Sequence, residues 1–191
     1  LLALSLVDRE RLLGGNWKIK PTSGTMFRRA WFEIVEAFPA ECKMIRAWDK
    51  AATEGGGDWT CGVKIGIWHG ITYVIDLQRQ QGSPLQNENL IKLTAELDGR
   101  NTKIFMEQEP GSAGVDVIDH YSREVLRGYT FKGHKSTGSK VDRANPFSAH
   151  VEAGNVKVVK GHWNKVFFDE LERFPSDDPK AHDDIVDACS L

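Results

Sequence analysis

Carboxylate side chains follow two strand-like segments of the sequence and recur near its end. Asp49 comes directly after the segment 43–48, and Glu107 comes directly after a shorter apolar segment. Asp183 and Asp184 stand near the start of a helix-like segment. Carboxylates that are brought together repel one another and resist burial unless a cation such as Mg²⁺ neutralises them. Two such ions, about 3.5–4 Å apart, can activate water and stabilise the leaving oxygen in phosphodiester cleavage.

Each of these acids also has an ordinary structural explanation. An Asp that follows a strand, such as Asp49, is commonly a turn residue or a helix cap. Glu107 lies just before a Pro-Gly pair, which is typical of a solvated loop. Acids at a helix start, such as Asp183 and Asp184, are favoured by the helix dipole. It is their joint placement in this order of elements that favours a shared cation site.

A meander of three antiparallel strands is predicted before the first long helix, and it sets the position of Asp49. Gly-containing turns over 54–58 and 69–70 join the three predicted strands, which cover 43–48, 59–68 and 71–77. Ser83 and Pro84 predict the start of a helix, because Ser caps helices and Pro suits their first turn. The apolar segment 103–106 is typical of a central strand that is buried on both faces.

The rest of the chain alternates helices with short strands, which indicates an α/β fold. The predicted elements are a helix over 115–126, a strand over 128–131, a helix over 142–153 interrupted at Pro146, a strand over 156–159 and a helix over 163–174. A last helix begins at Asp178 and carries Asp183, Asp184 and Asp187. We expect the polar, Gly-rich segment 132–140 to be a flexible basic loop.

The composition is that of an ordinary globular protein. The length of 191 residues predicts one domain, and no apolar run approaches the roughly 20 residues that span a bilayer. The apolar start lacks a basic region and a cleavage site, which argues against a secretory signal, and the missing initial Met indicates a fragment of a longer chain. The three widely spaced cysteines are expected to be reduced thiols, so zinc ligation is not predicted.

Charge is distributed unevenly although the net charge is only −2. The segment 123–165 holds nine basic and three acidic residues, whereas the segment 169–187 holds eight acidic and two basic residues. Such neighbouring segments suit a polyanion and a cation, although a mixed solvated surface explains the counts equally well. The segment 133–140 lacks the GxxxxGK[ST] pattern of a phosphate-binding loop, because Ser139 separates Gly138 from Lys140.

Several short motifs together give a more specific indication. They are Arg46–Ala51, Asp76–Arg79, Met106–Gly114, Ala153–Val156, Phe168–Leu171 and His182–Ala188, together with the aromatic segments Gly15–Trp17 and Phe27–Phe32. With these motifs the chain resembles the nuclease domain of a tailed-bacteriophage terminase large subunit, the DNA-packaging motor. The resemblance spans essentially the whole chain. It implies an RNase H-like mixed sheet, with three antiparallel strands and then parallel strands, flanked by helices.

The resemblance also implies a metal-dependent endonuclease that cuts concatemeric viral double-stranded DNA with two Mg²⁺ or Mn²⁺ ions. The implied catalytic residues and metal ligands are Asp49, Glu107, Asp183 and Asp184, and the lesser candidates are Glu109, His182 and Asp187. Glu107 is preferred to Glu109 because it directly follows the strand. Asp187 shares a helical face with Asp184, and His182 is a candidate for orienting a metal-bound water. The predicted DNA contacts are Lys50, Lys132, Lys135, Lys140 and Arg143.

The resemblance further implies that residues 1–40 form an entry segment from an N-terminal ATPase domain and that residues 41–191 form the nuclease domain. The implied partners are the portal and the small terminase subunit in the cytoplasm of an infected bacterial host, with no membrane. An isolated domain is expected to be monomeric. Two alternatives stay open: a Holliday-junction resolvase or other RNase H-like polynucleotidyl transferase, and a DNA-grip or docking module whose acids are structural.

Overall fold

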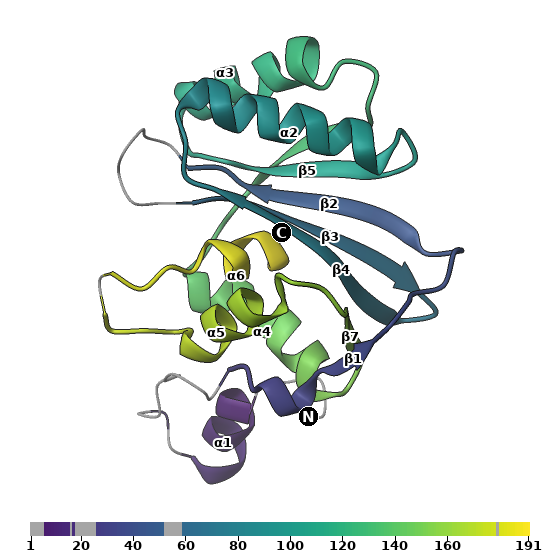
Figure 1. Ribbon diagram of the computed structural model, residues 1–191. Coiled ribbons are helices and arrows are strands. Elements are labelled where there is room, and N and C mark those ends of the chain that lie inside the picture. Colours follow the sequence, from purple (N-terminus) through teal and green to yellow (C-terminus); the bar gives the residue numbers. More distant parts are fainter. Residues whose placement is uncertain (1–5, 16, 18–25, 52–58, 179) are drawn as a thin grey trace.

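Three antiparallel strands form the centre of the structure. In the computed structural model, which describes residues 6–15, 17, 26–51, 59–178 and 180–191, these strands are β2 (Lys43–Asp49), β3 (Thr60–Trp68) and β4 (Ile71–Gln80) (Figure 1). β3 pairs with both neighbours, so the predicted meander is confirmed. His69 and Gly70 form the tight turn between β3 and β4, both with positive φ. The predicted turn over 54–58 lies outside the described residues.

Parallel strands extend this meander on both sides into one sheet with the order β1-β7-β4-β3-β2-β5-β6. β5 (Lys103–Gln108) pairs with β2, and β6 (Phe131–Lys135) pairs with β5. On the other side β7 (Val156–Val159) pairs with β4, and β1 (Glu33–Val35) pairs with β7. The predicted mixed sheet is therefore confirmed, with β2 and β5 as parallel neighbours near its middle.

One face of the sheet is covered by α2 (Pro84–Asp98), α3 (Ser112–His120) and the helical turn Tyr121–Val125 (Figure 1). Trp48 and Met106 belong to the core on this face, together with Ile91 of α2. Gly62 of β3 lies against the Trp48 ring, since a Cβ there would lie 2.5 Å from a ring carbon. Ser83 caps α2 and Gly99 follows it, as the sequence predicts.

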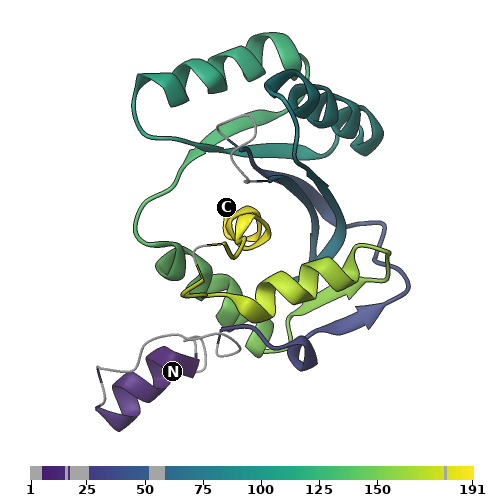
Figure 2. The same cartoon turned by 60° about the vertical axis from the view of Figure 1, so that its left-hand side comes forward.

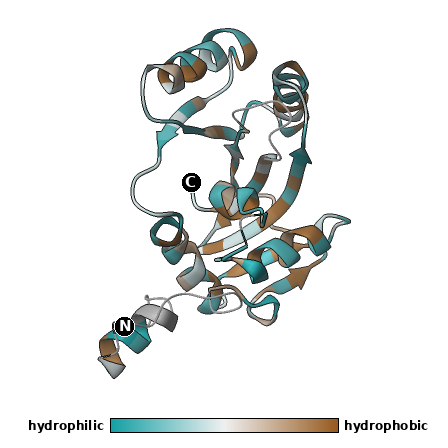
Figure 3. Cartoon of the chain, turned by 90° about the vertical axis from the view of Figure 1, so that its left-hand side faces the viewer, coloured by the Kyte–Doolittle hydropathy of each residue, from teal (hydrophilic) through white to brown (hydrophobic). Residues whose placement is uncertain are grey.

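The other face is covered by α4 (Lys140–Glu152), α5 (Asn164–Arg173) and α6 (Asp184–Cys189). Figure 2 looks along α6 and shows it in the concavity of the curved sheet, with the β6–α4 connection passing on its other side. The larger core lies here and includes Val63, Val158, Phe167 and Ile185. Figure 3 shows hydrophobic stretches in the central strands and mixed stretches in the covering helices.

Several predicted elements differ from the structure. The last helix begins at Asp184 and not at Asp178, because Asp183 takes a non-helical backbone conformation and precedes the first turn. The strand predicted over 128–131 begins only at Phe131, and most of it lies in the segment 132–140 that was predicted to be flexible, since parallel pairing with β5 holds residues 131–135 in the sheet. α4 begins at Lys140 and continues through Pro146 without a break.

The part of the predicted entry segment that the structure describes also packs onto this fold. α1 (Leu6–Gly14) ends at the pair Gly14-Gly15, and a single 3₁₀ turn covers Arg29–Trp31. Phe27 and Phe32 are buried in the core beside α5, where the Phe32 ring lies 5.4 Å from that of Phe168. Within the described residues, no helix is long and apolar enough to cross a membrane.

Candidate active site

Asp49 and Glu107 are neighbours at one edge of the sheet. The last paired residues of the parallel strands β2 and β5 are Trp48 and Met106, so the next residues, Asp49 and Glu107, lie side by side. Successive side chains of a strand point to opposite faces. Because Trp48 and Met106 belong to the core under α2 and α3, both acids belong to the opposite face, where α6 packs.

The short helix α6 brings the C-terminal acids to the same edge. Asp183 precedes its first turn, and Asp184 and Asp187 lie one turn apart on it. Asp184 and Asp187 are only 7% and 4% exposed, although their neighbours in the helix are almost all apolar. The apolar residues Ile185, Val186 and Ala188 bind α6 to the core, so the acids follow them into a nearly solvent-free position.

All of the predicted catalytic acids line one hollow of about 340 Å³. Its lining residues are Asp49, Lys50, Ala51, Glu107, Glu109, Lys140, Arg143, Asp183, Asp184 and Asp187. Six of these side chains are acidic and three are basic, which leaves a formal surplus of three negative charges. The residues come from β2, β5, α4 and α6 and from the segments beside them, so parts far apart in the sequence converge at this hollow, which we call the acidic site.

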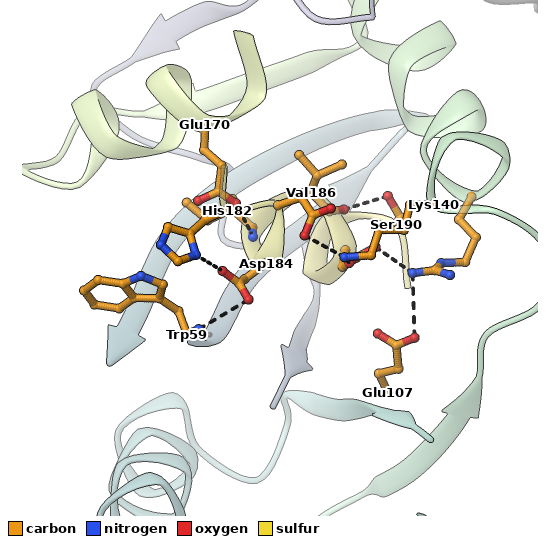
Figure 4. Close-up of polar contacts among 12 residues, drawn as sticks. Trp59, Glu107, Lys140, Glu170, His182, Asp184, Val186 and Ser190 are labelled. Atoms are coloured by element: carbon orange, nitrogen blue, oxygen red, sulfur yellow. Dashed lines mark hydrogen bonds and ion pairs between the residues drawn. The ribbon is translucent and has the colours of Figure 1, made fainter. Parts of the chain in front are cut away.

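Lys140 and Arg143, at the start of α4, are the cations that contact these acids. The Lys140 Nζ donates to Asp183 Oδ1 at 2.6 Å and lies 2.9 Å from Asp187 Oδ2. The Arg143 Nη2 donates to Asp187 Oδ1 at 2.6 Å and lies 3.7 Å from Glu107 Oε1 (Figure 4). Burial opposes the charge on Lys140, but its hydrogen bonds to Asp183 and Asp187 outweigh this effect and raise its pKa.

The surroundings of Asp49 disfavour its negative charge. Burial raises the pKa of Asp49 well above its ordinary value, and the negative charges of Asp187, Glu107 and Asp184 raise it further. The positive charge of Lys140 acts in the opposite direction and does not outweigh them. A carboxylate in this state is stabilised by an additional cation.

One carboxylate oxygen of Asp184 accepts a hydrogen bond, and the other has no hydrogen-bond partner. Its Oδ1 accepts a hydrogen bond from the backbone N–H of Trp59 at 3.3 Å, whereas its Oδ2 is buried without a hydrogen-bond partner. The His182 ring is close to this oxygen, since its Nδ1 lies 3.6 Å from Oδ2, and Figure 4 shows Trp59 and His182 on the same side of Asp184. Burial raises the pKa of Asp184, and the hydrogen bond from the Trp59 backbone offsets part of this rise.

The remaining predicted residues fall into two groups. Lys50 and Glu109 line the acidic site, and the Lys50 ammonium donates to the Ala51 carbonyl at 3.1 Å. His182 contacts Asp184 but lines a neighbouring hollow. Lys132 and Lys135 are exposed on the edge strand β6 and do not line the acidic site.

The donor set fits hard divalent cations, although no preformed cluster is present. Among the described residues, no three or more His, Cys, Asp or Glu side chains have the arrangement of a metal-binding group. The side chains around the hollow nevertheless offer carboxylate oxygens almost exclusively, which are the ligands that Mg²⁺ and Mn²⁺ prefer. The unpartnered Asp184 Oδ2 and the surplus negative charge are both features that a bound cation would satisfy.

Sequence reasoning did not assign a role to two charged residues beside the acidic site. Glu170 of α5 is 6% exposed, and its Oε1 accepts the Ile185 N–H of α6 at 2.6 Å. Arg79 of β4 lies 3.2 Å from the other Glu170 oxygen. Both residues belong to motifs that carried the resemblance, Asp76–Arg79 and Phe168–Leu171. The signal was therefore present, but no local pattern indicated what these residues contact.

Comparisons with known proteins agree with this architecture. Residues 46–191 match the family model described as the terminase RNaseH-like domain. A search of curated proteins found no significant match.

Solved structures of similar fold come from several bacteriophages. The large terminase nuclease from thermophilic phage G20c with bound magnesium superposes with a TM-score of 0.61 at 16% identity, covering 89% of this chain and 96% of that chain. The g2p (large terminase) nuclease domain from bacteriophage SPP1 with bound Mn gives a TM-score of 0.55 at 13% identity, covering 83% and 93%. The large terminase from a second thermophilic bacteriophage gives a TM-score of 0.60 at 13% identity, covering 89% of this chain but only 43% of that chain.

Proposed function

The chain belongs to the terminase RNase H-like domain family, and from this premise we propose that it is a metal-dependent endonuclease that cuts concatemeric viral double-stranded DNA during genome packaging. The observation that carries the proposal is the surplus of negative charge at the acidic site. The fold brings the partly buried Asp49 together with the buried Asp184 and Asp187, and three lining cations face six acids, so further positive charge from outside the chain would stabilise the charged carboxylates.

We propose that divalent ions supply this charge and that Asp49, Glu107, Asp183 and Asp184 hold them. When bound, two Mg²⁺ or Mn²⁺ ions would supply Lewis acidity for hydrolysis of the phosphodiester. Two of the structurally similar phage nucleases were solved with magnesium and with manganese, which supports the choice of ions. The side chains of the chain itself fix the ligand oxygens in place: the sheet holds Asp49 and Glu107, and the core contacts of α6 hold Asp184.

Lys140 and Arg143 have a second role in this proposal. Both stand at the start of α4, where Asp183 and Asp187 hold their charged groups at the rim of the acidic site. The Lys140 side chain is 51% exposed, so its ammonium is accessible to a DNA phosphate. These cations partly neutralise the acids and so reduce the repulsion that a DNA backbone would meet at the site.

Nonspecific contacts to the DNA backbone would come from residues in and around the hollow. Lys132 and Lys135 are exposed on β6, which neighbours the strand that carries Glu107. Lys50 adjoins Asp49 and lines the acidic site. Such contacts add affinity without sequence preference and weaken as salt rises.

Membership of the family also suggests how this chain fits into a complete packaging motor. This chain spans less than half of the large terminase from the second thermophilic bacteriophage, so the activity of a complete motor is part of the proposal. We propose that residues 41–191 form the nuclease domain and that residues 1–40 connect it to an ATPase domain, with β1 and the buried Phe27 and Phe32 joining this connection to the nuclease fold. The expected partners are the portal and the small terminase subunit, in the cytoplasm of an infected host.

A plasmid-cleavage assay with Mg²⁺ or Mn²⁺ tests the proposal. Asp49→Ala and Glu107→Ala should each lower metal-dependent cutting by more than about 100-fold, since even the outer partners of metal ligands typically contribute 10–100-fold. Glu96→Ala is the matched control, because Glu96 is exposed on α2, on the other face of the sheet.

Three outcomes would contradict the proposal. Cutting that survives both substitutions would exclude these acids from catalysis. DNA binding without any cutting, even at high protein concentration, would favour a docking module. A strong preference for four-way junctions over linear duplex would favour a resolvase.

A further inference from the structure

Glu170 of α5 contacts the first turn of α6 with one carboxylate oxygen and Arg79 of β4 with the other. Its Oε1 accepts the Ile185 N–H at 2.6 Å, and its Oε2 lies 3.2 Å from Arg79 Nη2. Ile185 directly follows Asp184 in the chain. Glu170 does not line the acidic site, and both of its oxygens are engaged within the chain. Its contacts therefore act on the backbone that carries Asp184.

Arg79 continues this link toward the other side of Asp184. Its guanidinium lies 4.0 Å from the centre of the Trp59 ring, which is close enough for a cation–π interaction. The backbone N–H of Trp59 in turn donates to Asp184 Oδ1 at 3.3 Å. Contacts thus run from Asp184 through Trp59 and Arg79 to Glu170, and return to Asp184 through the backbone of Ile185.

These contacts form a closed loop that engages only one of the two Asp184 oxygens. Oδ1 accepts the Trp59 hydrogen bond, while Oδ2 is buried with no hydrogen-bond partner. We infer that Glu170 and Arg79 are positioning residues of the nuclease, which fix Asp184 so that one oxygen stays available to a divalent cation. This inference rests on the proposed function. It adds a requirement for two residues that touch neither the ion nor the DNA.

Several polar atoms of these residues are buried without a hydrogen-bond partner, which is unusual in a protein core. Within the described residues, five buried side-chain polar atoms have no hydrogen-bond partner, and three of them are Trp59 Nε1, Arg79 Nε and Asp184 Oδ2. Unsatisfied buried groups cost stability, and each of them in a folded protein calls for an explanation such as a functional role or a bound ion. Three of the five atoms thus belong to residues of this one set of contacts.

Isothermal titration with Mn²⁺ tests the inference directly, because it measures ion binding independently of cleavage. Glu170→Gln keeps an oxygen that can accept the Ile185 N–H but removes the charge that holds Arg79. Arg79→Met removes the same link from its other end. Each variant should bind Mn²⁺ about 10–100-fold more weakly than the wild-type chain. Asp169→Asn is the matched control, since Asp169 lies on α5 and pairs with the exposed Lys165.

Two further readouts distinguish positioning from a general loss of structure. Because both substitutions break one link, the double variant should bind Mn²⁺ no more weakly than the weaker single variant. Raising the Mn²⁺ concentration should restore plasmid cutting by Glu170→Gln, whereas it should not restore cutting by Asp184→Asn. A structural defect would instead lower the unfolding midpoint and stay unresponsive to Mn²⁺.

The outcomes also separate this inference from the proposed function. Wild-type affinity for Mn²⁺ in Glu170→Gln and Arg79→Met, beside normal binding by the unaltered chain, would overturn the positioning role alone. Losses that add fully in the double variant would also overturn it. If the unaltered chain neither binds Mn²⁺ nor cuts DNA, the nuclease proposal fails, and the positioning role fails with it.

Discussion

Two groups of buried charges lie on opposite faces of strand β2, three residues apart in the sequence. The first group, the Arg46 cluster, consists of Arg46, Lys64, Asp76 and Asp98. Arg46 is 1% exposed and makes two hydrogen bonds to Asp98, at 2.7 Å and 3.0 Å, and one to Asp76 at 2.8 Å. Lys64 lies 2.9 Å from Asp98. The second group is the acidic site around Asp49.

The two groups differ in whether their positive and negative charges are equal in number. The Arg46 cluster holds two cations and two anions, and every one of its charges has a partner. Burial would raise the pKa of Asp98, but the hydrogen bonds and charges of Arg46 and Lys64 outweigh burial and lower it. At Asp49, burial and neighbouring acids act together, and the pKa is raised. Buried charge that is balanced within the chain is costly to disrupt by removing one partner, whereas an unbalanced surplus indicates an external ligand.

Removing Arg46 should give the largest effect on stability. Arg46→Met leaves Asp76 and Asp98 without their main partner, so the free energy of unfolding should fall by about 3–5 kcal/mol. Urea unfolding monitored by circular dichroism measures the change. Lys64→Met is the matched control and should cost less, because Arg46 still holds Asp98 in that variant. A loss below about 1 kcal/mol for Arg46→Met would show that the cluster is not a source of stability.

Glu170 predicts a dependence of stability on pH with a definite sign. Burial raises its pKa to about 7 from an ordinary 4.5, with the Ile185 N–H and Arg79 acting against burial. Between these values the folded chain retains a proton that the unfolded chain has released, so stability falls as pH rises. The metal-free wild type should therefore lose about 2–3 kcal/mol relative to Glu170→Gln between pH 4.5 and pH 7.

The measurement is a series of urea unfolding curves across that range for both proteins. The difference between the two proteins isolates Glu170 from Asp98, whose lowered pKa confines its own effect to more acidic solutions. A difference that stays constant with pH, or that grows in favour of the wild type as pH rises, would contradict the prediction.

Substitution of Asp49 should change stability in the direction opposite to that at Arg46. Asp49→Asn removes a charge that burial disfavours and that Asp187, Glu107 and Asp184 repel, so the metal-free chain should become more stable. If Mn²⁺ binds as proposed, it should raise the unfolding midpoint of the wild type, and Asp49→Asn should lose this rise. Thermal unfolding with and without Mn²⁺ tests both effects. Asp98→Asn is the matched control and should destabilise the chain, and the same sign for both variants would contradict the comparison.

The sequence was sufficient to predict the strands that carry the key acids. The apolar run before Glu107 and the strand before Asp49 are local patterns, whereas the parallel strands of the sheet were expected only from the resemblance to the family. The start of α6 was less well predicted, because the backbone of Asp183 departs from the helix only where α6 packs into the sheet.

The contacts that complete the acidic site could not be predicted from local patterns. Arg143 and Asp187 are 44 residues apart, and their pairing depends on how α4 and α6 pack together. Most of β6 was not predicted because its polar residues lack the apolar alternation of a half-buried strand. Its place at the edge of the sheet comes from backbone pairing with β5. Arg79 and Trp59 contact each other only because the pairing of β3 with β4 sets Arg79 opposite Cys61.

The smallest predicted effect concerns the exposed lysines of β6, which belong to neither buried group. If Lys132 and Lys135 contact the DNA backbone, alanine at either position should weaken duplex binding modestly and uniformly across sequences. Each substitution should also lower the slope of log K against log salt by about 0.9. Fluorescence anisotropy with a labelled duplex at several salt concentrations gives both quantities. Lys92→Ala is the matched control, since Lys92 is exposed on α2 across the sheet. An unchanged slope for both β6 variants would exclude this strand from the DNA path and restrict the cationic contacts to Lys50, Lys140 and Arg143.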